Sequence, residues 1–108
     1  MGPILHGLHA DLVPSTTADA DGFIPLEGAM KWAVAYTGPG PPKPSAAHRY
    51  TFLVFEQPES IDTAKLRSLF GWREDVGIFP RVRWDQEAFV TKTGLGPLVA
   101  SNFFLCQR

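Results

Sequence analysis

Residues 37–47 carry four prolines and two glycines, and no other feature constrains the fold of the chain as strongly. Proline fixes φ and removes an amide donor, whereas glycine adopts backbone angles closed to other residues. This segment therefore cannot be a helix or an inner strand, and we expect a rigid loop. The apolar, aromatic and β-branched residues 50–57 that follow predict a strand with apolar side chains on both faces, which needs cover on both sides.

His48, Arg49 and Tyr50 stand where this loop meets the strand. His48 is the only side chain of residues 36–57 that titrates near neutrality, and Arg49 is a permanent cation suited to carboxylate or phosphate. Tyr50 carries a hydroxyl on an apolar body. The triplet predicts a small site for an anion, and the alternative is a surface turn with a structural histidine.

Length and composition exclude several classes of protein. The 108 residues suit one domain, residues 1–108, and a net charge of −1 without a basic cluster argues against nucleic acid as a partner. No run of about 20 apolar residues predicts a membrane span, and no signal peptide is evident, so we expect a cytoplasmic protein. A single cysteine, Cys106, excludes an internal disulfide and a cysteine-based zinc site, and we expect neither a metal nor a cofactor.

Three further segments have the alternation or apolar character of strands, namely residues 5–13, 31–36 and 98–105. In the first, a period of two places His6 and His9 on opposite faces. Only one of these two imidazoles can therefore line a given pocket, and we expect it to be His6, together with His48.

Two short helices are predicted between the strands. The first has Ser60 or Asp62 as its N-cap and ends near Gly71, and the second begins after Asp85 and ends at Gly94. The predicted fold is therefore mainly β with two short helices, a β-rich α+β class. The three tryptophans are expected in the core or in a lid, and a ligand cage is the alternative.

Residues 36–50 resemble the phosphatidylethanolamine-binding protein family, whose pattern is close to Y-x-G-x-G-P-P-x-G-x-x-H-R-Y followed by an apolar strand. The matching positions are Tyr36, Gly38, Gly40, Pro41, Pro42, His48, Arg49 and Tyr50. Residues 5–8, 84–95 and 99–104 resemble the family's histidine strand, late helix and final pocket strand, in the expected order. Several segments are most similar to fungal-type members.

The resemblance implies an antiparallel β-sandwich with a pocket that binds an anionic or carbonyl-bearing small molecule. It implies His48, His6 and Tyr50 as catalytic residues. The ligand-binding residues that it implies are Arg49, Lys43, Gly38, Gly40, Pro41, Ser45 and Phe104. In the family the arginine of the triplet often supports the loop through ion pairing, so a structural role for Arg49 is the alternative.

The sequence departs from the family pattern in ways that affect the pocket. Members carry an N-terminal half that ends in Asp-Pro-Asp-x-Pro, and this sequence contains no such motif. Gly7 stands where the family has a bulky aromatic residue, so we expect a void or a more open pocket. Pro44 and Ser45 replace the Gly-Thr or Gly-Ser of the phosphate loop, which argues against classical phosphoethanolamine binding. We expect a truncated sandwich completed by oligomerisation, most simply as a homodimer.

Two functions are implied by the resemblance. The first is a cofactor-free, metal-independent enzyme of secondary metabolism, a cyclase, isomerase or lyase, in which an imidazole moves protons while Arg49 or Lys43 holds the anion. Holding a reactive compound in one conformation is an alternative source of rate enhancement. The second function is a non-catalytic binder of an anion or phospholipid headgroup that regulates a partner. A degenerate copy without a specific ligand is a third possibility.

Overall fold

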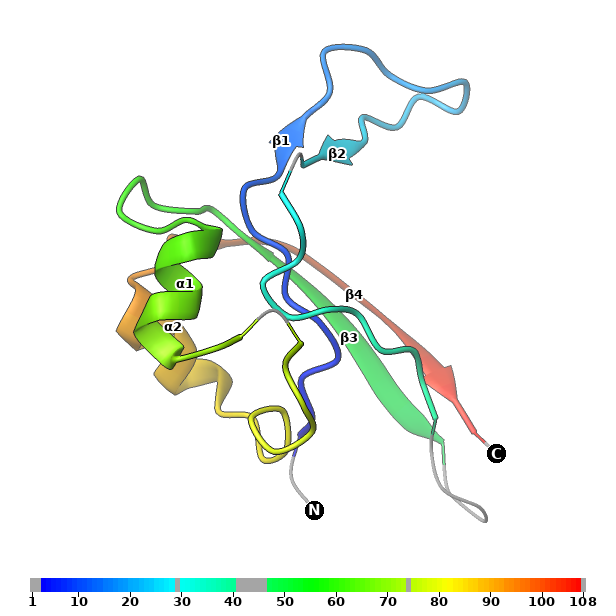
Figure 1. The fold of residues 1–108 in the computed structure, drawn as a ribbon. Helices are drawn as coiled ribbons and strands as arrows, with labels where there is room; N and C mark the ends of the chain where they lie inside the picture. The colour runs from blue at the N-terminus through cyan, green and yellow to red at the C-terminus, as the bar shows by residue number, and fades with distance from the viewer. Residues whose placement is uncertain (1–2, 29, 41–46, 74, 108) are drawn as a thin grey trace.

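The computed structural model of the protein describes residues 3–28, 30–40, 47–73 and 75–107 (Figure 1). Along the chain the elements are β1 (Val13–Pro14), β2 (Leu26–Glu27), β3 (His48–Phe55), α1 (Thr63–Phe70), α2 (Gln86–Thr93) and β4 (Leu98–Cys106). β1 pairs with β2 and β3 pairs with β4, and both pairings are antiparallel. The prediction of a mainly β fold with two short helices is confirmed.

The β3–β4 ladder is the longest element of the fold. It runs from the pair His48–Cys106 to the pair Phe55–Leu98, with an irregularity between Val54 and Phe55. Phe52, Leu53 and Val54 are all exposed, although they point alternately to the two faces. The expected cover on both faces of this strand is therefore not provided by the described residues of a single chain.

Both helices begin and end where the sequence predicts. The Asp62 side chain accepts a hydrogen bond from the Lys65 amide at the start of α1, and Gly71 ends the helix with a left-handed backbone at φ 68°. Asp85 and Gly94 cap α2 in the same way, with φ again 68° at the glycine. Aspartate satisfies free amides at a helix start and glycine adopts positive φ at a helix end, which explains why these short helices have sharp limits.

The predicted strands at residues 5–13 and 31–36 are wrong as continuous strands. Leu8 and Val34 form a single antiparallel bridge between these two segments. Ile4 and Val82 form a second isolated bridge. The N-terminal segment passes between two others, because the Leu5 amide donates to the Arg81 carbonyl while the Leu8 amide donates to the Val34 carbonyl. Asp11 then turns the chain with a left-handed backbone at φ 62°. The N-terminal segment is therefore hydrogen-bonded to the segments around Val34 and Arg81, and it is not a strand of a continuous sheet.

The core lies between the helices and the N-terminal segment. Leu66 of α1 and Phe89 of α2 are buried together with Ala10 and Ala33. Around them pack Leu8, Ile61, Phe70, Trp72, Trp84 and Leu95. Trp72 and Trp84 thus belong to the core, and α1 and α2 lie together at one side of the molecule (Figure 1).

Asp11 ties the N-terminal segment to the start of α1. Its Oδ2 accepts hydrogen bonds from the Thr63 amide (2.9 Å) and hydroxyl (2.6 Å), and its Oδ1 accepts one from Gln57 Nε2 (2.7 Å). Desolvation acts to raise the pKa of this carboxyl group, but the hydrogen bonds from Thr63 and Gln57, together with the nearby His9, lower it more. The ionised carboxylate therefore stabilises the folded state.

Replacing Asp11 by Asn should lower the free energy of unfolding by about 2 kcal/mol at neutral pH, because the amide offers one oxygen to three donors. Asn tolerates a left-handed backbone, so the substitution tests the carboxylate alone. Because the folded-state pKa is lowered, the difference from wild type should be full above about pH 5 and vanish as the pH falls below about 4. Denaturant unfolding across this range measures the difference. Asp21→Asn, at an exposed position, is the control, and equal losses in both variants would contradict the role of Asp11.

Candidate functional site

His6 is held by hydrogen bonds to Thr37, the first residue of the Gly/Pro loop. Its Nδ1 lies 2.8 Å from the Thr37 carbonyl oxygen, which can only accept a hydrogen bond, so Nδ1 carries the proton. In the neutral ring Nε2 is then the acceptor. The backbone of His6 is fixed as well, because its carbonyl accepts the Thr37 amide at 2.7 Å. His6 therefore presents a positioned nitrogen that can accept a proton.

An aromatic cluster on β3 and β4 lies against His6. The Tyr50 ring meets the His6 ring edge-on at 5.1 Å and stacks on Phe104 at 5.2 Å, and Phe104 also contacts Phe52 at 6.0 Å. His48 lies two residues before Tyr50 and so projects from the same face of β3. Within the described residues the His6 and His48 rings make no direct contact.

His9 takes the opposite direction, in agreement with the alternation of the sequence. Its ring stacks on Trp32 at 4.7 Å, and its Nε2 lies 3.3 Å from the Met30 carbonyl oxygen. His9 therefore lies apart from the cluster around Tyr50. A substitution at His9 is a suitable control for one at His6.

Arg49 lies away from His6 and Tyr50, and its role in ligand binding stays a prediction. Its guanidinium sits 4.9 Å from the centre of the Phe103 ring, on the face of the ladder opposite to Tyr50. The alternation of side chains along a strand is the physical reason, since neighbours in β3 point to opposite faces. Arg49 therefore packs as a cation on an aromatic ring and is not gathered with His6.

A cavity of about 380 Å³ opens beside His6, and we call it the His6 cavity. Its lining residues are Ile4, Leu5, His6, Thr37, Gly38, Gly40, Val76, Gly77, Ile78 and Arg81. It contains three predicted site residues, His6, Gly38 and Gly40. The predicted residues Pro41, Lys43 and Ser45, and most of the expected rigid loop, lie outside the described residues.

Arg81 is the residue of this cavity that the sequence did not reveal. It is only 6% exposed. Its Nη1 donates to the His6 carbonyl at 3.2 Å and to the Thr37 hydroxyl at 3.3 Å, while Nε and Nη2 both donate to the Val76 carbonyl, at 3.3 and 3.2 Å. All three acceptors are uncharged, so the positive charge is buried without a carboxylate among these partners.

The His6 cavity favours an anion on electrostatic grounds. Among the described residues no acidic side chain lines it, and Arg81 supplies a charge in a low-dielectric wall. Gly38 and Gly40 also line the cavity, and backbone amides at such positions can act as donors to an anion. No group of three or more metal-binding side chains occurs in the described ranges.

Gly7 leaves no void, contrary to the expectation from the sequence. A Cβ atom at this position would lie 2.8 Å from Cζ3 of Trp32 and 3.1 Å from the Tyr36 Cα. The indole ring thus occupies the space that a larger side chain would need. Trp32 is held between this glycine and the His9 ring, and it lines a second hollow described below.

Comparison with known proteins gives the family. Residues 1–104 match the family model described as phosphatidylethanolamine-binding protein. The chain is 36% identical over 104 residues to the "Phomoidride biosynthesis cluster protein N" of Talaromyces stipitatus, covering 95% of this chain and 49% of that protein. It is 34% identical over 77 residues to the "Carboxypeptidase Y inhibitor" of Saccharomyces cerevisiae, covering 68% of this chain and 32% of that protein. No solved structure matched the chain significantly.

The chain spans half or less of the length of these two relatives. Within the described residues, no helix combines the length and the apolar character needed to cross a bilayer. The family match extends over both helices, the β3–β4 ladder up to Phe104 and the residues that form the His6 cavity. The chain belongs to the phosphatidylethanolamine-binding protein family.

Proposed function

We propose that the chain binds an anionic or carbonyl-bearing apolar metabolite at the His6 cavity and acts on it as a cofactor-free enzyme of secondary metabolism. The observation that carries the proposal is the buried Arg81 charge beside a positioned His6 imidazole, in a cavity whose lining is free of acidic side chains. The name of the Talaromyces relative, a biosynthesis cluster protein, supports a biosynthetic setting.

The chemistry assigned to the site is proton transfer on a bound anion. His6 Nε2 or His48 takes or gives the proton, and the Arg81 field and the Gly38 and Gly40 amides stabilise negative charge on a carboxylate or enolate. Phe52 and Phe104 offer an apolar surface for the body of the metabolite. Isomerisation, cyclisation and decarboxylation all need these two elements, an acid–base group and an anion site.

A second candidate is a non-catalytic binder that regulates a partner protein. It is favoured by the similarity to a yeast protein named as an inhibitor of carboxypeptidase Y. Incubation with a fungal metabolite extract, followed by mass spectrometry, separates the two functions. An enzyme converts at least one apolar acid into a new product, whereas a regulator binds acids and returns them unchanged.

Inorganic phosphate should bind the His6 cavity, and replacing His6 by Ala should weaken the binding by about tenfold, since the hydrogen bond that a phosphate O–H donates to His6 Nε2 is lost. Titration followed through the imidazole NMR signals measures this affinity. His9→Ala is the matched control, because His9 contacts Trp32 on the other side of the segment. Equal weakening in both variants, or phosphate shifts at His9 alone, would place the anion elsewhere.

We also propose that the chain functions as a homodimer through the outer face of the β3–β4 ladder. This face carries Leu53, Phe103 and Leu105, which are 41, 54 and 61% exposed. On the same face these three residues pair with Ser101, Thr51 and Arg49. Exposed apolar side chains grouped in this way favour association, and a two-fold interface covers them with a second copy. Light scattering at micromolar concentration should give twice the 11.9 kDa of one chain, and a stable monomer would refute the dimer.

A further inference from the structure

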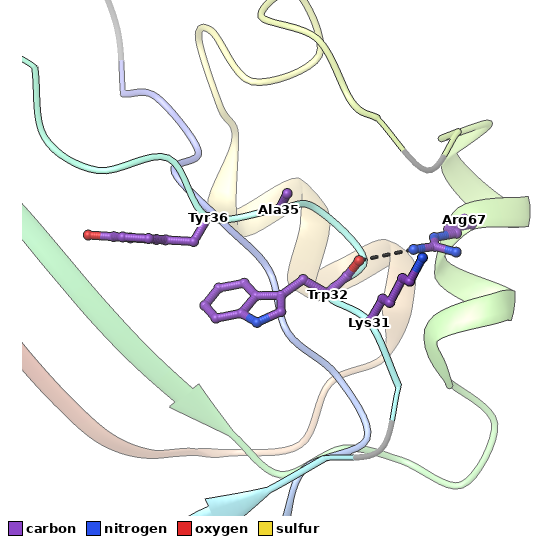
Figure 2. Close-up of a pocket in the computed structure, with 5 residues that line it drawn as sticks. All are labelled: Lys31, Trp32, Ala35, Tyr36 and Arg67. Carbon is purple, nitrogen blue, oxygen red and sulfur yellow. Dashed lines mark hydrogen bonds between the residues drawn. The ribbon is translucent and has the colours of Figure 1, made fainter.

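A second hollow, the Trp32 groove, lies apart from the His6 cavity. It is lined by Lys31, Trp32, Ala35, Tyr36 and Arg67 and has a volume of about 380 Å³ (Figure 2). No residue lines both hollows. The functional residues predicted from the sequence are absent from this groove, so any ligand here is additional to the one assigned to His6.

The groove has an aromatic side formed by two partly exposed rings. Trp32 is 39% exposed and Tyr36 is 48% exposed, and their ring centres lie 5.9 Å apart with an angle of 45°. The His9 ring stacks on Trp32, and the indole fills the space that a side chain at position 7 would occupy. A flat apolar body can lie on a ring that is already held in place, at a small cost in conformational entropy.

The other side of the groove is cationic. Arg67 and Lys31 approach the same end in Figure 2, and among the described residues no acidic side chain lines the groove. Arg67 Nη2 donates to the Trp32 carbonyl at 3.0 Å, whereas the buried Nε has no acceptor. A guanidinium carries five N–H donors, so one hydrogen bond leaves most of its capacity for a carboxylate.

From this arrangement we propose that the Trp32 groove binds an amphipathic carboxylate with a flat aromatic or conjugated body. The carboxylate pairs with Arg67 and Lys31, and the body stacks on Trp32 and Tyr36. Planar carboxylate recognition is the geometry for which arginine is best suited. The site is independent of the proposed anion site at His6.

The probe for the groove is 2-naphthoate, followed through the indole N–H signals of the three tryptophans by NMR. Binding should shift the Trp32 signal and leave Trp72 and Trp84, which pack in the core, nearly unchanged. Arg67→Gln should weaken binding by about tenfold, while Arg73→Gln, the same change at an exposed position, should leave it unchanged. 2-Naphthalenemethanol, which lacks the charge, should bind wild type about tenfold more weakly, a comparison that needs no variant.

Several outcomes would overturn the assignment. Equal binding of naphthoate to the Arg67 and Arg73 variants, or equal binding of the acid and the alcohol, would remove the carboxylate site. Loss of naphthoate binding in His6→Ala with no effect of Arg67→Gln would move the ligand to the His6 cavity. Phosphate binding in the Arg67 variant reports separately on that cavity, so the failure of one site is distinguishable from the failure of the other.

Discussion

Replacing Arg81 by Met is expected to lower the free energy of unfolding by about 3 kcal/mol or more. The substitution keeps an unbranched side chain but removes all four hydrogen bonds of the guanidinium. The Val76 carbonyl loses both of its Arg81 donors, and the His6 carbonyl and the Thr37 hydroxyl lose one each. Proteins of this size have total stabilities of roughly 5–15 kcal/mol, so the loss brings the variant close to unfolding.

Thermal and denaturant unfolding measure this effect, with two comparison variants. Arg73→Met makes the same chemical change at an exposed position and should shift the midpoint little. Arg81→Lys keeps the charge but offers an ammonium that cannot reach the three acceptors together, so intermediate stability is expected. Equal midpoints for Arg81→Met and Arg73→Met would show that the bonds of Arg81 do not hold His6, Thr37 and Val76 together.

Replacing Leu53 by Lys is expected to convert the proposed dimer into monomers. Leu53 lies on the outer face of β3, opposite Ser101, and is 41% exposed in the single chain. The fold of one chain should therefore tolerate the lysine, since exposed substitutions change stability by about 0.5 kcal/mol or less. In the dimer the ammonium would be buried among apolar side chains, which should raise the dissociation constant by about 100-fold or more.

Sedimentation over a range of micromolar concentrations measures the dissociation constant. Val13→Lys in β1 is the matched control, because Val13 is also an exposed apolar strand residue but lies on the other two-stranded sheet. It should leave the mass unchanged. If Leu53→Lys stays dimeric while folded, or if both variants dissociate alike, the outer face of the ladder is not the interface.

The helices were predictable because their signals are local. Asp62 and Gly71 limit α1 through contacts with residues a few positions away, and Asp85 and Gly94 do the same for α2. Such signals depend on the chain itself and not on distant partners. The strands of the β3–β4 ladder were found for a related reason, because long runs of apolar and β-branched residues have few alternatives.

The N-terminal segment was mispredicted because its conformation is set by distant parts of the chain. Its hydrogen bonds go to Val34 on one side and Arg81 on the other, so the alternation of its residues does not extend into a ladder. Arg81 was missed for the same reason. It belongs to no motif, and its acceptors on His6 and Thr37 are far from it in sequence.

Arg49 differs from the N-terminal segment and from Arg81, because the sequence itself indicates that its side chain points away from those of His48 and Tyr50. It stands between His48 and Tyr50 on a strand, and a period of two sends it to the opposite face. The prediction that Arg49 binds the ligand followed the family pattern and did not take this alternation into account. When a motif lies on a strand, neighbouring residues of the motif point to opposite faces of the sheet, so they should not be assigned to the same site.

The β3–β4 ladder also has a consequence for the kinetics of folding. Phe52 pairs with Asn102, and both helices lie in the chain between them. Closing this long loop costs conformational entropy before any ladder hydrogen bond forms, whereas each helix forms from neighbouring residues. We therefore expect pairing of the two strands to limit the folding rate. Until it occurs, two long apolar strands expose unpaired amide and carbonyl groups, so the rate of loop closure sets how long a newly made chain is prone to aggregate.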